Sequence, residues 1–369
     1  MKSVVRIMLI VFILAFPALC YAFEPGEYVS FGTYEGEPIV WRVTHTDSGN
    51  AYLISHKIIC LKSLDSEDAD WSSSDLRKWL NSSSDTDGVY NEPGFLNLSN
   101  FSEFERTLFV NTSHSVVLNT EHSSRAHMGS EPAYYDYSPK LDEEKFPLAY
   151  RETVEDTIFL PDAELIDKLY TDVNTFGVEY NMALPTEYAV SQLDSDDICT
   201  DGNWFYWTGD ALSFSADLAD CRMIDNTNKI ISAKAYNPTV GVRPVCRISV
   251  DSAVVLKGDG TETTPYNITG YTDGDGNPYV DFSKDGANIK VTVYGVSHER
   301  FEEGNLVIAG YTDNRTQLTF AERINLASYN ITDNKVQNSF PIGDTAYVRV
   351  YIWDTQLDSL VKVTEWSVK

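Results

Sequence analysis

Apolar and polar residues alternate along the first part of the chain, and this pattern predicts strands separated by tight turns. Residues 26–59 contain the segments "YVSFGTY", "PIVWRVTHT" and "AYLISHKII", with turn-forming residues at 35–36 and 48–50. Ile39, Trp41 and Val43 lie on one face of the middle segment, because successive side chains of a strand point to opposite sides. We therefore expect a half-buried antiparallel meander over residues 26–59.

The next segment, "WSSSDLRKWLN" at residues 71–81, has the period of a helix. Ser72 can cap the first turn, with Asp75 three residues further on. The apolar residues that share one helical face are Leu76, Trp79 and Leu80. We expect this face to lie on the meander, and Arg77 and Lys78 to point partly to solvent.

The rest of the first half alternates between irregular segments and short regular ones. Residues 111–150 have little periodicity and many His, Ser, Tyr and Pro residues, which is typical of a long surface loop. "DTIFLPDAELIDKLY" predicts a short strand followed by a helix that begins near Pro161 and Asp162. "ALPTEYAV", "NWFYWTGD", "LADCRMI" and "GVRPVCRISV" predict mostly short strands. The polar stretch at 258–272 is expected to be a linker.

The pattern of the last hundred residues predicts strands and no helix. "NIKVTVYGV", "NLVIAGYTD", "AERINLASYNI" and "TAYVRVYIWD" alternate in polarity, and no helical pattern interrupts them. We expect an all-β sandwich over residues 273–369.

The N-terminus has the order of a secretory signal peptide. Two basic residues, Lys2 and Arg6, precede an apolar run over 7–19, and cleavage is expected after Ala22. Leu19 stands before Cys20, where a lipoprotein signal has a small residue, so lipid anchoring is disfavoured. No later stretch is apolar over about 18 residues. We expect an exported, extracytoplasmic chain with no transmembrane segment after cleavage.

The charge of the chain restricts its partners. The formal net charge is −27, and removal of residues 1–22, which contain two basic residues and no acidic residue, lowers it to −29. Such a surface repels phosphate backbones, which argues against nucleic acid as a partner. Cations, neutral glycans and basic protein patches remain compatible with it.

Four cysteines follow the signal segment: Cys60, Cys199, Cys221 and Cys246. An even number in an exported chain is compatible with two disulfides, for which three pairings exist. We expect Cys199 to pair with Cys221 and Cys60 with Cys246. The alternative is that some of them are buried free thiols.

Six segments of the chain resemble, in the same order, the successive blocks of the bacterial family called domain of unknown function 6273. They are "FGTYEGEPIVWRV", "WSSSDLRKWLN", "DTIFLPDAELIDKLY", "ALPTEYAV", "NWFYWTGD" and "GVRPVCRI". The resemblance covers about residues 26–256 and implies an exported or surface-exposed protein with no assigned activity. The later blocks are also similar to C-type-lectin-like and formylglycine-generating-enzyme-like domains.

This wider similarity implies an α+β fold over residues 23–257, with short antiparallel sheets whose first and last strands meet. It also implies that Arg243 ties the closing strand to neighbouring loops. The segment after residue 272 resembles the immunoglobulin-like or fibronectin-like modules of bacterial surface proteins. "NWFYWTGD" departs from the expected pattern after its aromatic residues, which weakens any ligand inferred from that strand.

Aromatic residues in "NWFYWTGD" are the candidate ligand-binding residues. We take Trp204, Tyr206 and Trp207, together with Arg243, as a site where flat rings could stack on a sugar or a peptide. The alternative is that both faces of this strand are covered and the rings belong to the core.

A calcium site is possible at the start of the second domain. Asp273, Asp275, Asn277 and Asp281 have the alternating spacing of a calcium-binding loop. Pro278 stands where such a loop needs glycine, and Lys284 stands where it needs a closing glutamate. A plain turn is the alternative.

Other chemistry is only weakly indicated. His114, His122 and His127 lie near Glu121 and could hold zinc, although their spacing matches no known motif. His45, His56 and His298 are isolated. Motifs of serine hydrolases, zinc proteases, P-loop proteins and dinucleotide-binding proteins are missing from the sequence.

These features favour an exported surface protein that binds a glycan or a protein at the cell envelope without catalysis. An envelope enzyme is the alternative from another class, either an oxidase similar to formylglycine-generating proteins or a glycan hydrolase. A spacer without a small ligand is the third possibility.

Overall fold

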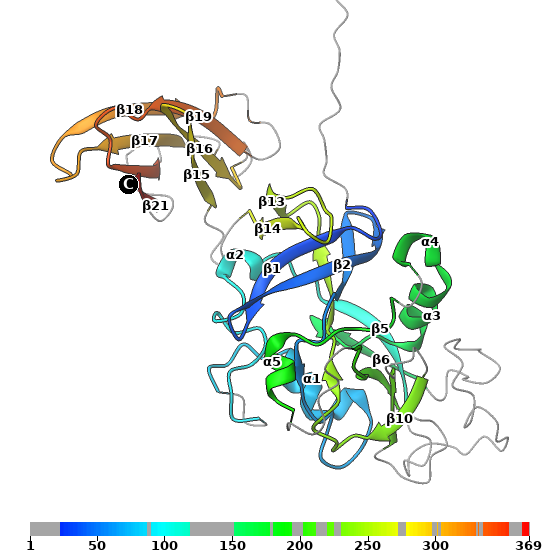
Figure 1. Ribbon diagram of the computed structural model, residues 1–369. Coiled ribbons are helices and arrows are strands. Elements are labelled where there is room, and N and C mark those ends of the chain that lie inside the picture. Colours follow the sequence, from blue (N-terminus) through cyan, green and yellow to red (C-terminus); the bar gives the residue numbers. More distant parts are fainter. Residues whose placement is uncertain are drawn as a thin grey trace, which may run out of the picture.

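The computed structural model describes residues 23–86, 90–118, 151–177, 180–193, 202–211, 220–224, 230–271, 278–296, 301, 304–329, 331, 335–353 and 364–368. Two β-rich units follow each other along the chain (Figure 1). The first contains the meander, the helices and the segments that resemble the family, and the second contains the C-terminal strands.

A seven-stranded sheet organises the first unit, in the order β13-β14-β1-β2-β3-β12-β7. The meander is confirmed, because β1, β2 and β3 pair in antiparallel fashion one after another. The closing strand β12 also pairs with β3. The strands are β1 (Tyr28–Tyr34), β2 (Glu37–Asp47), β3 (Asn50–Ser55), β7 (Ile158–Phe159), β12 (Val245–Ser249), β13 (Ala253–Lys257) and β14 (Tyr266–Gly270).

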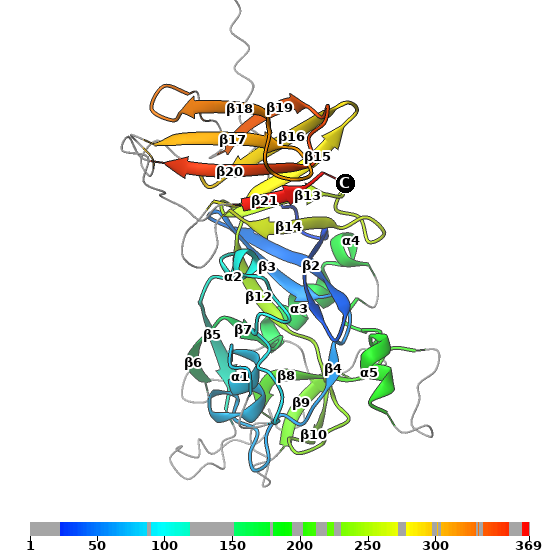
Figure 2. The same cartoon turned by 90° about the vertical axis from the view of Figure 1, so that its left-hand side faces the viewer.

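Two smaller sheets complete the first unit. One has the order β10-β9-β8-β11-β4, and the other is the hairpin of β5 and β6. The strands are β4 (Cys60–Leu61), β5 (Thr112–Val117), β6 (Arg151–Asp156), β8 (Tyr206–Ala211), β9 (Asp220–Ile224), β10 (Ile230–Lys234) and β11 (Gly241–Val242). Figure 2 shows β8, β9 and β10 at the lower end of the first unit and β5 beside β7.

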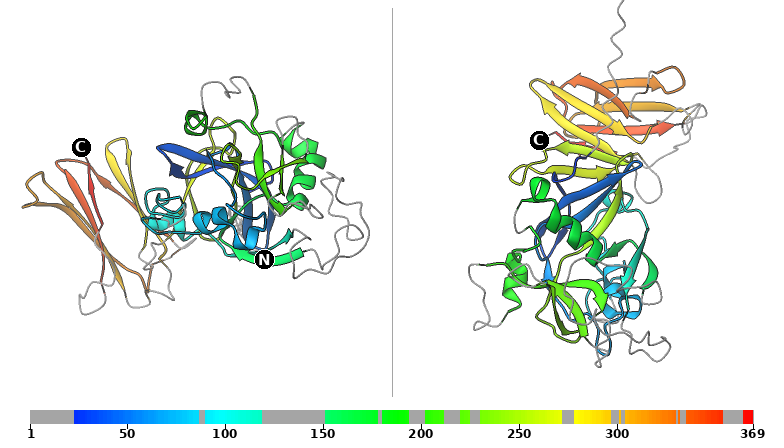
Figure 3. Two further views of the ribbon diagram at one scale, coloured as in Figure 1. Left: turned by 90° about the horizontal axis from the view of Figure 1, so that it is seen from below. Right: turned by 90° about the vertical axis from the view of Figure 1, so that its right-hand side faces the viewer.

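The helices of the first unit are short and lie on the outside of the sheets (Figure 3). They are the 3-10 helix Trp71–Ser73 and the helices α1 (Asp75–Leu80), α2 (Glu103–Arg106), α3 (Ala163–Thr171), α4 (Val173–Phe176) and α5 (Glu187–Ser191). The cap of α1 is Ser74, whose side chain accepts a hydrogen bond from the Arg77 amide, and the prediction of Ser72 was wrong. The predicted apolar face of α1 is fully buried.

The fold class predicted from the sequence was wrong. Strands make up 48% of the described residues and helices 11%, so the structure is mostly β and not a C-type-lectin-like α+β fold. The longest described helix, α3, has nine residues. Helices this short bury little surface by themselves, and the core of the first unit is accordingly built on its strands.

Two sheets that share one apolar core form the second unit. Their orders are β15-β16-β19 and β18-β17-β20-β21. Ile289 and Val291 from one sheet meet Leu306 and Val348 from the other in this core. The strands are β15 (Val280–Asp285), β16 (Asn288–Tyr294), β17 (Asn305–Tyr311), β18 (Leu318–Asn325), β19 (Lys335–Pro341), β20 (Tyr347–Trp353) and β21 (Thr364–Ser367).

The junction between the units is structured over most of its length. The stretch expected to be a linker, 258–272, contributes β14 to the seven-stranded sheet, where β14 runs parallel to β1. Beyond it, the Tyr279 amide donates a hydrogen bond of 2.7 Å to the carbonyl of Tyr271. The Tyr279 ring also packs edge-on against Phe104, with ring centroids 5.0 Å apart.

Candidate functional site

The residues predicted to bind a ligand lie in the core. Trp204 is 8% exposed, and Tyr206, Trp207 and Arg243 have no exposed surface. Each indole nitrogen donates to a backbone carbonyl, Trp204 Nε1 to Thr239 and Trp207 Nε1 to Lys62. The structure therefore favours the alternative that these rings are part of the core, where they offer little or no surface to a ligand.

Arg243 has the tying role that the resemblance implied. Its Nε donates to the carbonyl of Ser55 over 2.9 Å, and its Nη1 lies 3.2 Å from the Tyr206 hydroxyl and 3.3 Å from the carbonyl of Asn181. These contacts join the closing segment to the meander and to the loop before α5. Its function is therefore structural.

The cysteines form no reactive pair in the described part of the chain. Cys60 and Cys246 are buried free thiols, so the predicted bond between them is not formed. Burial raises the pKa of Cys60 to about 12 and that of Cys246 well above its usual value. Thiols held protonated in this way are poor nucleophiles, which argues against oxidase chemistry. Cys199 lies outside the described residues, so its pairing with Cys221 stays a prediction.

The predicted metal residues are mostly outside the described part of the chain. Asp273, Asp275 and Asn277 lie there, and so do His122, His127 and Glu121. Asp281 is described, in β15. Among the described residues, no group of three or more His, Cys, Asp or Glu side chains is placed to hold a metal ion. The calcium site stays a prediction.

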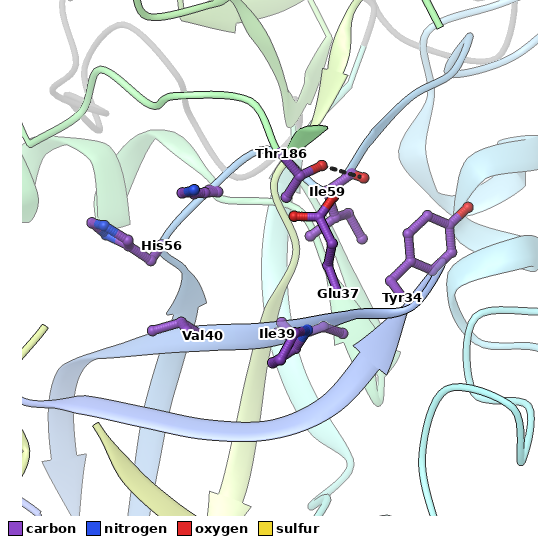
Figure 4. A pocket seen from close by; sticks show the side chains of 9 residues that line it. Tyr34, Glu37, Ile39, Val40, His56, Ile59 and Thr186 are labelled. Atoms are coloured by element: carbon purple, nitrogen blue, oxygen red, sulfur yellow. Dashed lines mark hydrogen bonds between the residues drawn. The ribbon is translucent and has the colours of Figure 1, made fainter. Parts of the chain in front are cut away.

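Three pockets are lined by described residues of the first unit, and Figure 4 shows the smallest of the three, of about 100 Å³. Glu37 reaches into it, but its carboxylate accepts a hydrogen bond from the Tyr188 amide. The Thr186 hydroxyl on the same wall donates to the carbonyl of Ile59 (Figure 4). Because these polar groups fasten α5 to the sheets, we regard this pocket as structural.

A second pocket, of about 440 Å³, lies at the turn between β2 and β3. The third pocket has a volume of about 380 Å³ and lies between the meander, β5 and α3. Its size falls within the usual range for small-molecule sites, roughly 300 to 1,000 Å³. Polar and aromatic side chains are mixed on its walls with a few aliphatic ones. The lining residues are Thr44, His45, Tyr52, Thr112, Ser113, His114, Ser115, Phe159, Asp162, Leu165, Lys168 and Val245. We name it the β2–β5–α3 pocket.

A β-bulge in β2 forms one wall of this pocket. Val43 pairs with Leu53, but His45 pairs with Tyr52, so β2 has one extra residue, Thr44, at this point. Bulges re-aim the side chains next to them. Here Thr44 is fully buried, and the His45 ring lies flat on the Tyr52 ring, with centroids 4.0 Å apart and 13° between the planes.

The hydrogen bonds of Thr44 determine which nitrogen of His45 carries a proton. The Thr44 hydroxyl donates its only proton to the carbonyl of Tyr52, and its oxygen lies 3.1 Å from His45 Nδ1. Nδ1 must therefore be the donor in that contact. Burial lowers the pKa of His45 to about 4, helped by the charge of Lys168. His45 is thus neutral at pH 7, and its Nε2 carries a lone pair.

A buried carboxylate fixes the opposite wall. Asp156 Oδ2 accepts hydrogen bonds from His114 Nε2 at 2.9 Å and from Trp71 Nε1 at 2.8 Å. Its Oδ1 accepts from Arg77 Nε at 2.7 Å. Burial alone would raise the pKa of Asp156, but the hydrogen bonds from His114 and Trp71 and the charge of Arg77 outweigh it and lower that pKa. The His114 ring stacks on Phe159, with centroids 4.3 Å apart.

The segment "WSSSDLRKWLN" is therefore fastened to β6 and β7 as well as packed under the sheet. Arg77 points partly to solvent, as expected, with 26% of its side chain exposed, and its guanidinium is also paired with Asp156. At the end of the same segment, Asn81 accepts hydrogen bonds from the amides of Thr157 and Ile158. These contacts hold β6, and hence His114, against the pocket.

Most of this site has no direct signal in the sequence. His45 was interpreted as isolated, and His114 was placed in an irregular loop, although it lies in β5. Tyr52 and Phe159 were interpreted only as strand residues. A polar Thr-His-Thr run at the end of an apolar strand was the one available signal for the bulge.

The stability of the native protein should fall as the pH drops from about 6.5 to about 4 because of His45. The pKa of His45 is lower in the native state than in the unfolded chain, so in this interval the unfolded chain binds a proton that the native state excludes. We expect a loss of about 1 to 2 kcal/mol, allowing for the partly exposed ring. Urea unfolding at pH 7.0, 5.5 and 4.5 measures this loss.

His45→Phe supplies the control for that measurement. This variant should lose less stability between pH 7.0 and 4.5 than the wild type, because its residue 45 does not titrate. The pKa of His56 is also lowered by burial, so a smaller slope should persist. Equal slopes in the two proteins would contradict the assignment to His45.

Comparison with known proteins identifies the family. The chain belongs to the family described as Domain of unknown function (DUF6273), whose sequence model matches residues 48–250. That range includes His45's partner Tyr52, together with His114, Asp156 and Lys168. No curated protein matches the chain.

Solved structures add no argument about fold or function. A hypothetical protein from Pyrococcus horikoshii OT3 is 12% identical, with a TM-score of 0.20, over 25% of this chain and 88% of that protein. An endonuclease/exonuclease/phosphatase from Beutenbergia cavernae DSM 12333 is 9% identical, with a TM-score of 0.21, over 71% of this chain and 74% of that one. Among the described residues, no helix is long and apolar enough to cross a membrane.

Proposed function

We propose that this chain is an exported bacterial protein that binds a small polar ligand without catalysis, in the β2–β5–α3 pocket. The observation that carries this proposal is the pocket itself, which is concave and contains both aromatic and polar side chains. Its walls are fixed by the Thr44 bulge on one side and by the Asp156 hydrogen bonds on the other. A preorganised site of this kind loses little entropy when a ligand binds.

Export is supported by the signal-like segment and by the residue that follows it. Phe23, the first residue after the expected cleavage point, is 1% exposed and packs against Tyr266, with ring centroids 5.9 Å apart. The first residue expected after cleavage is thus part of the core of the first unit. The two-sheet unit at the C-terminus would serve as a spacer or interaction module.

The burial of the His114 Nδ1 atom favours binding over catalysis. A histidine held by a carboxylate is the usual partner of a catalytic nucleophile. The other ring nitrogen of His114, Nδ1, is buried and has no hydrogen-bond partner among the described residues. A general base must reach the proton that it removes, so this buried nitrogen is poorly placed for catalysis.

A ligand screen with a blocked pocket tests the proposed function. Ser113→Trp places a large ring at the rim of the pocket, and Ser83→Trp is the matched control at an exposed serine outside it. Thermal shift against a panel of glycans, peptides and amino acids should find ligands that raise the Tm of the wild type and of Ser83→Trp. The same ligands should not raise the Tm of Ser113→Trp. If no ligand in the panel is sensitive to Ser113→Trp, the proposal fails and a spacer role is favoured.

A further inference from the structure

We propose that the ligand of the β2–β5–α3 pocket is a neutral sugar ring, one of whose hydroxyl groups donates a hydrogen bond to His45 Nε2. This inference rests on the proposed function and specifies its ligand. It follows from the charge, the hydrogen-bonding capacity and the apolar surface of the pocket.

The charges of the pocket indicate a neutral ligand. Two residues of opposite charge, Asp162 and Lys168, contribute to its lining. His45 is neutral, as shown above, so the wall formed by the meander adds no charge. An anionic ligand would also be repelled by a chain whose net charge is −27. A cationic ligand would find a single carboxylate in this lining.

The hydrogen-bonding groups indicate hydroxyl groups on the ligand. His45 Nε2 makes no hydrogen bond to a described residue, and its lone pair can only accept one. The Ser113 and Ser115 hydroxyls, also in the lining, can each donate and accept. A ligand that matches this set must donate a hydrogen bond at one point and both donate and accept at others. Sugar hydroxyls meet that requirement at several points of one small ring.

The apolar part of the pocket suits the carbon face of such a ring. The His45 and Tyr52 rings stack in parallel, and Arg247 lies over the Tyr52 ring, 5.2 Å from its centroid. Because His45 covers one face of Tyr52 at 4.0 Å, the guanidinium must lie on the other face. Both faces of Tyr52 are therefore occupied, and the flat surface that remains on this wall belongs to His45. Leu165 and Val245 add aliphatic surface to the lining.

The size of the pocket limits the ligand to a short saccharide. A volume of about 380 Å³ is near the lower end of the usual range for ligand sites. The recognised unit could be a free sugar or the terminal residue of a glycan chain. Both sources have the same chemistry and must be separated by experiment.

Titration calorimetry with methyl glycosides of neutral hexoses and N-acetylhexosamines tests this inference. His45→Phe keeps a flat ring on Tyr52 but removes the lone pair, and should weaken binding about three- to tenfold, the usual value of one hydrogen bond. His56→Phe is the matched control, since His56 is also half-buried and follows β3 but lies outside this pocket. Its affinity should equal that of the wild type. Oligosaccharides ending in the same sugar should bind more tightly than the methyl glycoside only if a glycan chain is the source.

The experiments distinguish failure of the sugar inference from failure of the proposed function. If only charged ligands or peptides bind, and Ser113→Trp abolishes their binding, the sugar inference is overturned while the proposed function stands. If sugars bind equally well to His45→Phe and to the wild type, the role of Nε2 is refuted. If no ligand of any class depends on the pocket, both proposals fail. Should His45→Phe melt well below the wild type, Ser113→Trp still shows whether the sugar binds in this pocket, and loss of sugar binding in that variant is the expected result.

Discussion

Asp156→Asn should destabilise the protein by about 2 to 4 kcal/mol, one of the largest effects expected from a single substitution in this chain. The carboxylate is 3% exposed and accepts hydrogen bonds from Trp71, His114 and Arg77. An amide offers one acceptor oxygen in place of two, and its NH₂ group would face a donor. The guanidinium of Arg77 would also lose its counter-charge. Urea unfolding followed by far-UV circular dichroism at pH 7 measures the change in the free energy of unfolding.

Asp75→Asn is the matched control for this measurement. Asp75 pairs with Lys78 at 3.1 Å in the same helix, but the lysine side chain is 58% exposed. Exposed ion pairs contribute about 0 to 1 kcal/mol, so this variant should remain close to the wild type. Similar losses in the two variants would contradict the assignment of Asp156 as the anchor of α1.

The stability that Asp156 contributes depends on pH in a different interval from that of His45. Its pKa is lower in the native state than in the unfolded chain, so the contribution is complete above the unfolded value of about 3.9. It is lost as the pH falls through the lower native value. Acid denaturation should therefore include two contributions in separate pH intervals, that of His45 between about pH 6.5 and 4 and that of Asp156 below it.

The parts of the fold that depend on local pattern could be predicted from the sequence. The meander follows from alternation at Ile39, Trp41 and Val43, all three of which are buried. The apolar face of α1 follows from helical spacing in the same way. Each of these predictions needs only a period and a turn signal within a short window.

The candidate site could not be predicted, because it depends on the register between distant strands. His114 and Asp156 are 42 positions apart, and Arg77 is 79 positions from Asp156. No periodicity within a short window connects residues so far apart. The stack of His45 on Tyr52 requires one extra residue in β2, and a shift of one residue reverses which face a side chain occupies. The pattern of apolar residues alone does not locate such a bulge.

The segment "NWFYWTGD" shows that residue types alone do not predict whether a strand binds a ligand. Trp204, Tyr206 and Trp207 have the residue types of a sugar-binding surface, and the sequence left the core as an alternative. The choice depends on what covers the strand. β8 lies between β9 and β11 in its sheet, and all three rings are buried. The polar–aromatic surface that is open to a ligand instead comes from the end of the meander.

Arg243→Lys should cost about 2 to 4 kcal/mol of stability, even though it keeps the charge. The guanidinium has no exposed surface, and two of its nitrogens reach the carbonyl groups of Ser55 and Asn181 and the Tyr206 hydroxyl. It also lies over the Tyr206 ring, with its central carbon 5.1 Å from the ring centroid. An ammonium group is compact and cannot span these acceptors while lying flat on a ring, so a buried carbonyl would lose its partner.

Arg315→Lys is the matched control for Arg243→Lys, since the Arg315 side chain is 50% exposed and pairs with Glu365 on the surface. It should shift the urea midpoint little.

The measurement of Arg243→Lys also distinguishes the two roles considered for Arg243. A structural anchor predicts a large loss of stability and, in whatever fraction remains folded, an unchanged affinity for any ligand of the β2–β5–α3 pocket. A ligand-binding residue predicts near wild-type stability and weakened binding. The complete burial of Arg243 makes the first outcome the expected one, because a ligand cannot reach a side chain with no exposed surface.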